Sequence, residues 1–289
     1  MKNWHRASPA LLTLLAFLLA QVLGSLLLLA AAALASPDAR AAVLAYVSGD
    51  AQGMAVAGTI PVSYLALALM TGNLLALLAC HFLLHSIRPV TLADIARINW
   101  RAGLTGIAGG IFGAMGISTL TDNVELPDMM KQLSLDMSHD VWGLLALTIV
   151  GPLTEEILFR EAVEGEMLRR GVRPWTAIGI SALTFSLAHL NLAQGIYALP
   201  LGILFGIIYC KTGNIVLTTI LHILNNGIAA MQLRSMGEHF NDRSPADWFG
   251  STTATSLFAA SCSVLCLAFT WAFWNRYRPH TEKKKHGHP

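Results

Sequence analysis

Two adjacent glutamates and an arginine lie in an apolar stretch that begins at Val141, in the segment Thr154-Glu155-Glu156-Ile157-Leu158-Phe159-Arg160. Ionisable side chains in such a setting are costly, usually face a protein interior or a water-filled cavity, and mark function by default. Glu156 and Arg160 are four residues apart and can pair on one helix face, whereas Glu155 points about a third of a turn away. The spacing therefore predicts a structural Glu156–Arg160 pair and leaves Glu155 free for chemistry.

Two further apolar stretches carry histidine. Phe185 and His189 are four residues apart in the first, and His222 and Asn226 are four apart in the second. Each histidine or asparagine taken alone is explained by a hydrogen bond to a neighbouring membrane helix, and the Glu–Arg pair by an internal strut. Together, a carboxylate, two imidazoles and an amide are suited to activating water and stabilising an oxyanion.

A metal site is the rival interpretation of the same residues. Two histidines and a carboxylate are the ligands of many catalytic zinc sites, so Glu155, His189 and His222 form the alternative ligand set. Against zinc, the sequence lacks the HExxH pattern, and Asn226 is better suited to donating hydrogen bonds. We expect a hydrolase without a cofactor, with the zinc-dependent version kept open.

The elements that position these residues must be membrane helices. The chain has 289 residues, of which 54% are hydrophobic and only 12% charged, with a mean hydropathy of +0.56. Soluble domains have about a quarter of their residues charged, so we predict an all-α, multi-pass membrane bundle. A span needs about 20 apolar residues. Eight runs qualify, the fifth and sixth being short: 11–35, 61–84, 102–120, 141–159, 174–190, 195–210, 215–233 and 254–274.

The basic residues predict the orientation of the spans. With the amino terminus inside, 15 of the 19 lysines and arginines fall on cytoplasmic segments, and Arg40, Lys131, Arg234 and Arg243 remain outside. The positive-inside rule then places both termini in the cytoplasm, in a cell (inner) membrane. Because this topology accounts for the basic balance, we expect the lipid bilayer and no nucleic acid as a partner.

A hairpin of the fourth and fifth spans sets the level of the site. Glu155 lies 17 residues before Val172 and His189 lies 17 after it, so both are roughly 25 Å from the turn. The level of His222 stays open from the sequence. Gly171 suits a C-cap and Pro174 a first helical turn, and the charged residues 161–170 predict that the fourth helix continues past the bilayer.

The remaining patterns divide the chain into three regions. Residues 1–140 form a region of three spans and an acidic outer segment, 141–233 the catalytic core, and 234–289 an outer loop, a last span and a basic tail. The acidic segment around 126–137 has helical apolar spacing, typical of a helix on the membrane surface, with a plain loop as the alternative. Glycines recurring in the third span predict close helix packing.

The three polar motifs together resemble a known family. Glu155-Glu156-x-x-x-Arg160, Phe185-x-x-x-His189 and His222-x-x-x-Asn226 are similar to the ordered motifs of the CAAX-protease and bacteriocin-processing (Abi) family of intramembrane endopeptidases. The resemblance covers about 141–231. It implies that Glu155 and His189 activate a water, that His222 and Asn226 form an oxyanion hole, and that Glu156 and Arg160 support the site.

The resemblance also implies the class of substrate. Eukaryotic members of the family cleave after a prenylated cysteine, and bacterial relatives act in peptide maturation, bacteriocin immunity and membrane-protein cleavage. We therefore expect peptide-bond hydrolysis in a hydrophobic or lipidated peptide or a membrane protein. A proton-coupled carrier that uses Glu155, His189 and His222 as a relay, and a non-catalytic immunity or scaffold protein, are the alternatives from other functional classes.

Overall fold

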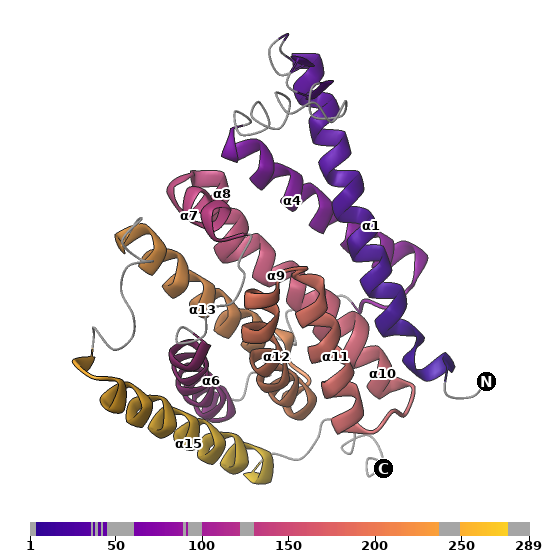
Figure 1. The fold of residues 1–289 in the computed structure, drawn as a ribbon. Coiled ribbons are helices and arrows are strands. Elements are labelled where there is room, and N and C mark those ends of the chain that lie inside the picture. The colour runs from indigo at the N-terminus through magenta and orange to yellow at the C-terminus, as the bar shows by residue number, and fades with distance from the viewer. Residues whose placement is uncertain are drawn as a thin grey trace.

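Every regular element in the described part of the chain is a helix. The computed structural model describes residues 4–35, 37, 40–41, 43–44, 61–88, 91, 100–121, 130–236 and 249–276. The all-α membrane bundle predicted from composition is confirmed. The helices, shown in Figure 1, are α1 Trp4–Ala35, α4 Val62–Leu78, η1 Ala79–Leu83, α6 Trp100–Thr121, α7 Lys131–His139, α8 Val141–Leu145, η2 Ala146–Val150, α9 Gly151–Glu156, η3 Ile157–Gly165, α10 Glu166–Arg169, α11 Pro174–Ala188, α12 Leu192–Thr212, α13 Ile215–Met236 and α15 Thr252–Arg276.

Seven helices in the described ranges are long and apolar enough to cross a membrane. The expected fifth span is the shorter helix α11, which has 15 residues. The expected sixth span is longer than its apolar run, because α12 continues from Leu192 to Thr212. The structure does not describe either chain end, nor most of the residues in the outer loops predicted at 36–60, 122–140 and 234–247. Within the acidic segment 122–140, helix α7 is described near the end.

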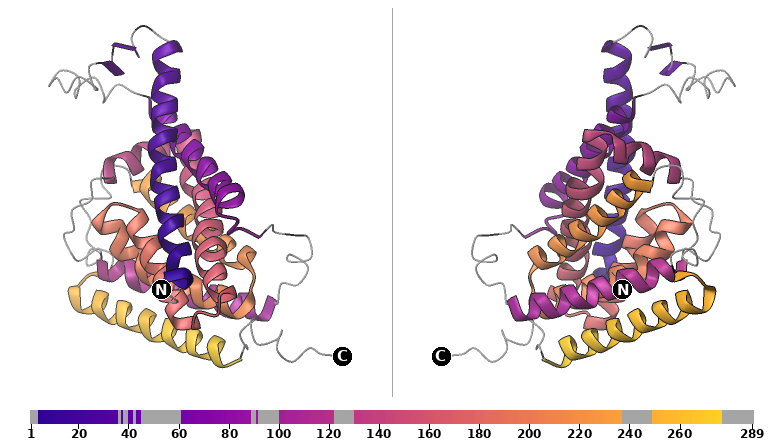
Figure 2. Two further views of the ribbon diagram at one scale, coloured as in Figure 1. Left: turned by 90° about the vertical axis from the view of Figure 1, so that its right-hand side faces the viewer. Right: turned by 90° about the vertical axis from the view of Figure 1, so that its left-hand side faces the viewer.

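Three helix pairs build the bundle. Helix α1 packs along α4, α11 along α12, and α6 along α15. The continuous helix that runs from α8 to α10 lies between them and contacts α1, α11, α12 and α13. Figure 1 shows α1 and α15 on opposite sides of the bundle, and Figure 2 shows that they run at a steep angle to each other. The central helix is therefore contacted by side chains from several neighbouring helices. The predicted motifs lie at these contacts.

Glycine allows the peripheral pairs to approach closely. A Cβ atom on Gly24 of α1 would lie 2.6 Å from the backbone nitrogen of Gly72 on α4. On α6, a Cβ on Gly113 would lie 3.0 Å from Cys266 of its partner α15, and one on Gly110 would lie 2.5 Å from Leu221 of α13. The close packing predicted from the glycines of this span is confirmed, because any larger side chain would meet a neighbouring helix.

The central helix changes register twice, at the π-helical segments η2 and η3. At the end of η2 the Gly151 N–H bonds to the carbonyl of Ala146, five residues earlier. The next residue, Pro152, has no N–H to donate. The carbonyl of Leu147 therefore has neither its four-residue nor its five-residue donor within the helix. Such π segments often accompany functional sites.

The hairpin between α10 and α11 forms as the sequence predicts. Gly171 has a φ of +76°, which glycine adopts without strain. Its N–H bonds to Leu168 and that of Val172 to Met167, the pattern of a Schellman C-cap. Pro174 then occupies the first turn of α11.

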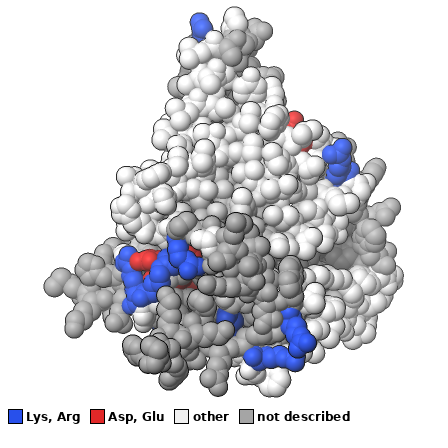
Figure 3. All heavy atoms as spheres, turned by 180° about the vertical axis from the view of Figure 1, so that it is seen from behind, with Lys and Arg blue, Asp and Glu red and all other residues white. Residues whose placement is uncertain are grey.

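Burial differs from expectation in the charged stretch 161–170. Glu161 is 4% exposed and Glu164 is fully buried, whereas Arg169 and Arg170 are exposed. Glu161 is held by Arg169 and by the Tyr209 hydroxyl, at 2.6 and 2.5 Å. Figure 3 shows blue and red atoms gathered in a few patches of the rear face, with most of the described surface uncharged. Such an uncharged surface suits contact with lipid.

Candidate active site

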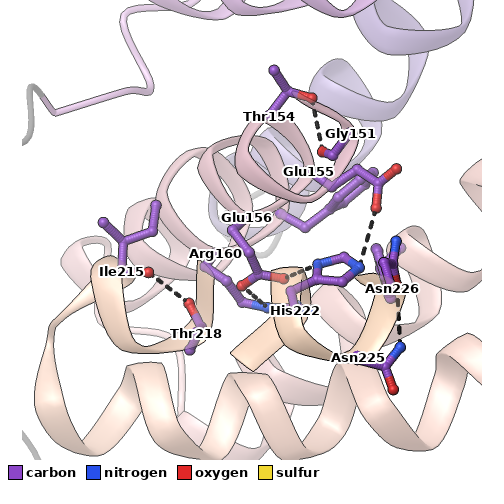
Figure 4. A network of polar contacts seen from close by, with 12 residues as sticks. Gly151, Thr154, Glu155, Glu156, Arg160, Ile215, Thr218, His222, Asn225 and Asn226 are labelled. Carbon is purple, nitrogen blue, oxygen red and sulfur yellow. Dashed lines mark hydrogen bonds and ion pairs between the residues drawn. The ribbon is translucent and has the colours of Figure 1, made fainter. Parts of the chain in front are cut away.

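Glu156 is the buried centre of the polar network. It ends α9, its side chain is fully buried, and its Oε2 accepts from Arg160 Nε at 3.2 Å. The other oxygen, Oε1, lies 3.1 Å from His222 Nδ1 on α13 (Figure 4). Because a carboxylate accepts, this contact assigns the Nδ1 hydrogen to His222. The structure thus contains the i,i+4 pair predicted from spacing and adds an imidazole to it.

Arg160 is desolvated and held from several directions. Its Nη1 donates to Ser181 Oγ on α11 at 2.8 Å, and Ser181 in turn donates to the carbonyl of Phe159 at 2.7 Å. The guanidinium carbon lies 5.2 Å from the ring centroid of Phe185 and 5.9 Å from that of Phe205. A buried cation needs such compensation, because removing it from water is costly.

His222 lies between the two adjacent glutamates. Its Nε2 is 3.7 Å from Glu155 Oε2, while its Nδ1 bonds to Glu156. The His222 side chain is only 5% exposed, and that of Glu155 is 22% exposed. The level of His222, which the sequence leaves open, is therefore that of the glutamate pair. Glu155 is the carboxylate with an accessible edge.

His189 approaches the site through an aromatic ring. It follows α11, and its Nδ1 lies 2.9 Å from the carbonyl of Phe185. A carbonyl only accepts, so Nδ1 carries the hydrogen and Nε2 keeps a lone pair. Phe185 packs edge-on against both His189 and His222, with centroids 5.0 and 5.7 Å apart. Among the described residues, His189 makes no hydrogen bond or ion pair with Glu155 or His222.

Asn226 faces the central helix one turn after His222. Its Nδ2 donates to the carbonyl of Leu147 at 3.1 Å, and its Oδ1 accepts from Asn225 Nδ2 at 3.1 Å. Figure 4 shows Asn226 beside the Glu155–His222 contact. One amide hydrogen of Asn226 is thus used by Leu147, and a second stays available for a bound group.

The structure brings the predicted site residues together, but it does not bring the three alternative zinc ligands together. Glu155, Glu156, Arg160, Phe185 and His222 form one connected cluster, with His189 and Asn226 at its edges. Within the described ranges, no three histidine, cysteine, aspartate or glutamate side chains are grouped as ligands of one metal ion. Glu155 and His222 approach each other, but His189 does not join them as a third ligand.

Several contributing residues are absent from the sequence prediction. Ser181, Phe205, Tyr197 and Asn225 support the motif residues from helices α11, α12 and α13. Ser181 and Asn225 could have been noticed as polar side chains inside apolar runs. Phe205 and Tyr197 carry no such signal, because aromatic residues are ordinary components of membrane helices.

The fold and the cluster describe a multi-pass membrane protein with a polar site assembled from several of its helices. Residues 137–228 match the family model described as "Type II CAAX prenyl endopeptidase Rce1-like". This segment holds all the predicted site residues. The family resemblance drawn from the three motifs is confirmed for this segment.

Two curated relatives agree with this assignment. The chain is 25% identical over 142 residues to "Putative membrane peptidase YdiL" of Bacillus subtilis (strain 168), which covers 48% of this chain and 55% of that protein. It is 31% identical over 90 residues to "Membrane-embedded CAAX protease MroQ" of Staphylococcus aureus (strain USA300), covering 29% and 36%. The matches thus span about half and about a third of these relatives. No solved structure matches the chain at the same level of significance. The protein is a multi-pass protein of the cell membrane.

Proposed function

We propose that this protein is an intramembrane endopeptidase that hydrolyses a peptide bond in a hydrophobic or lipidated peptide or a membrane protein. The observation that carries the proposal is the chain Glu155–His222–Glu156–Arg160, in which only Glu155 has an accessible edge. A base that must reach a water is well served by such a chain, in which the far end is buried and fixed and the Glu155 carboxylate is partly accessible. The names of the two relatives support a peptidase of this kind.

In the proposed reaction, Glu155 accepts a proton from water as the water oxygen attacks the scissile carbonyl carbon. His189 assists through the lone pair of Nε2, which its Nδ1 contact to Phe185 leaves available. The same proton passes from Glu155 to the leaving amine nitrogen when the carbon–nitrogen bond breaks. Proton transfer by such a group contributes about 10²- to 10⁴-fold.

The developing oxyanion needs donors. In the proposed mechanism His222 is an imidazolium, with Nδ1–H held by Glu156 and Nε2–H turned to the site, and Asn226 gives its second amide hydrogen. Fixed donors in a water-poor site stabilise such charge strongly. Glu156 and Arg160 do not contact the substrate in this mechanism. They hold the His222 ring in place, Glu156 directly and Arg160 through Glu156.

A zinc-dependent version of the same protease is the second candidate, because the free Nε2 of His189 is also a suitable metal ligand. It would use Glu155, His189 and His222 as ligands and would leave the site without an obvious separate base. Chelation separates the two versions, as described in the Discussion.

The substrate can be found by comparing membrane proteomes of cells that express the wild type, Glu155→Gln or Asp136→Asn. Asp136 is an exposed carboxylate on α7 and serves as the matched control. Uncleaved precursors should accumulate with Glu155→Gln and not with Asp136→Asn. Identical precursor profiles for the wild type and Glu155→Gln would contradict the proposed function.

A further inference from the structure

The backbone carbonyl of Leu147 is the final acceptor of a chain of side-chain hydrogen bonds through Asn226, Asn225 and Tyr197. Within the helix its possible donors are lost, because Gly151 N–H bonds to Ala146 and Pro152 has no N–H. A carbonyl shielded from water without a donor is costly, and Asn226 Nδ2 supplies a donor to this partly buried one at 3.1 Å. The Gly-Pro pair on the central helix thus creates a fixed acceptor for Asn226.

This acceptor fixes the orientation of every amide in the chain. Since a carbonyl can only accept, the NH₂ group of Asn226 must face Leu147, and its Oδ1 must face the opposite way. That oxygen accepts from Asn225 Nδ2 at 3.1 Å, which turns the Asn225 Oδ1 toward α12. There it accepts from the Tyr197 hydroxyl at 2.9 Å. Amide orientations are often ambiguous, but here one backbone oxygen determines both of them.

The chain joins three elements at the predicted oxyanion donor. Leu147 belongs to η2, Asn225 and Asn226 to α13, and Tyr197 to α12. With one hydrogen bonded to Leu147 and its oxygen held by Asn225, the Asn226 amide plane is fixed from two sides. Its second N–H then has a single direction. A fixed donor stabilises an oxyanion better than a rotating one, because no reorganisation is needed during the reaction.

We propose that Tyr197 and Asn225 are positioning residues that fix the amide plane of Asn226 and aim its second N–H at the reacting carbonyl oxygen; this rests on the proposed function. The two residues act through Asn226 and do not touch the substrate in this account. A purely structural role, in which the chain only joins α12 to α13, is the alternative that the test must separate.

The kinetic test is a double-mutant cycle on the full-length protein in detergent or lipid, with a substrate peptide from the proteome comparison. Asn226→Ala should lower kcat about 10²-fold or more, as loss of one oxyanion donor does, with KM almost unchanged. Tyr197→Phe removes only the hydroxyl and should lower kcat about 10-fold, by analogy with the lower end of the loss when a side chain that orients a metal ligand is removed. In the Asn226→Ala background, Tyr197→Phe should have no further effect on kcat.

Tyr209→Phe is the matched control on the same helix. Like Tyr197→Phe, it removes a hydroxyl that holds a polar partner, here the buried Glu161. We expect it to lower thermal stability without a change in kcat. Equal losses of kcat in Tyr197→Phe and Tyr209→Phe, or a Tyr197→Phe loss that persists in the Asn226→Ala background, would show a structural role and overturn the proposal.

A spectroscopic arm does not depend on activity. In protein labelled with ¹⁵N-asparagine, the side-chain amide resonances of Asn226 are identified by their loss in Asn226→Ala. Tyr197→Phe should displace or broaden them, and Tyr209→Phe should not. If the wild type cleaves no peptide, the proposed function fails and this arm alone decides on positioning: displaced resonances support it, and unchanged resonances overturn it.

Discussion

Residues 137–228 and the other described helices bury different kinds of side chain. The charged side chains that the described structure buries all lie within this segment: Glu156, Arg160, Glu161, Glu164, Lys211 and His222. The described helices outside it bury uncharged polar groups such as Thr13, Asn73 and Thr255 among small and apolar residues. Buried charge in the described structure is thus confined to the part of the chain that matches a protease family model.

The two regions are also held together differently. Outside the segment, α1 and α4 touch at Gly24 and Gly72 and share one hydrogen bond, from Gln21 Nε2 to Asn73 Oδ1 at 2.6 Å. Inside it, helices are joined by the ion pair of His222 with Glu156 and by a cation–π contact of Arg160 with Phe185 at 5.2 Å. Because small residues suffice to pack membrane helices, the buried charges need another reason, and the proposed catalysis would supply it for Glu156, Arg160 and His222.

The largest expected stability effect is at Glu156. Glu156→Gln should lower stability by about 3 to 5 kcal/mol, because Arg160 and His222 lose the buried charge that compensates them. Glu155→Gln, at the accessible neighbour, should unfold at nearly the wild-type temperature. Thermal denaturation in detergent measures both. A stable Glu156→Gln and an unstable Glu155→Gln would reverse the roles of the two residues.

A smaller effect is expected where packing alone holds the helices. Gly24→Ala should lower stability by about 1 to 3 kcal/mol, because its Cβ would meet the α4 backbone. Gly179→Ala is the control, since nothing lies within 4 Å of its Cβ position. Activity per folded molecule should stay at the wild-type level in both. Equal melting temperatures for the two variants would show that the α1–α4 contact is not close.

Glu164 sharpens the comparison, because it is a buried carboxyl without a hydrogen-bond partner in the described structure. Glu164→Met removes this unsatisfied polar group and should raise the free energy of unfolding by about 1 kcal/mol, if the buried carboxyl itself does not stabilise the fold. The melting temperature against the wild type is the readout. A lowered melting temperature would mean that Glu164 has a stabilising partner and belongs with Glu156.

The smallest expected effect is that of metal removal. Prolonged chelation should leave activity unchanged, and purified protein should contain substoichiometric zinc. This expectation rests on Asn226, an amide suited to donating hydrogen bonds beside the Glu155–His222 contact, and on His189, which has no hydrogen bond or ion pair with Glu155 or His222 in the described structure. One zinc per active chain, with activity lost on chelation and restored by added zinc, would replace this mechanism with the zinc-dependent one.

Local features of the site and fold could be predicted from the sequence. The Glu156–Arg160 pair follows from helical spacing, and the turn at Gly171 and Pro174 follows from backbone preferences. The membrane class follows from composition alone. These features depend on a few neighbouring residues, which is why a single sequence is sufficient for them.

Features that depend on how helices meet could not be predicted. The Glu156–His222 bond joins residues 66 apart and requires the packing of α13 on α9. The burial of Glu161 requires Tyr209 from α12, and hydropathy does not show which side of a charged helix faces inward. The Gly151-Pro152 pair was a usable signal for the free Leu147 carbonyl, but its partner Asn226 is known only from tertiary structure.

The most direct test of the central claim is peptide cleavage in water enriched in ¹⁸O. Purified wild-type protein and Glu155→Gln are incubated with the substrate peptide, and the new carboxyl terminus is analysed by mass spectrometry. If Glu155 activates a water, wild-type protein should yield a terminus that carries ¹⁸O, and folded Glu155→Gln should yield no product. Cleavage by Glu155→Gln at the wild-type rate, or a wild-type product without ¹⁸O, would contradict the account.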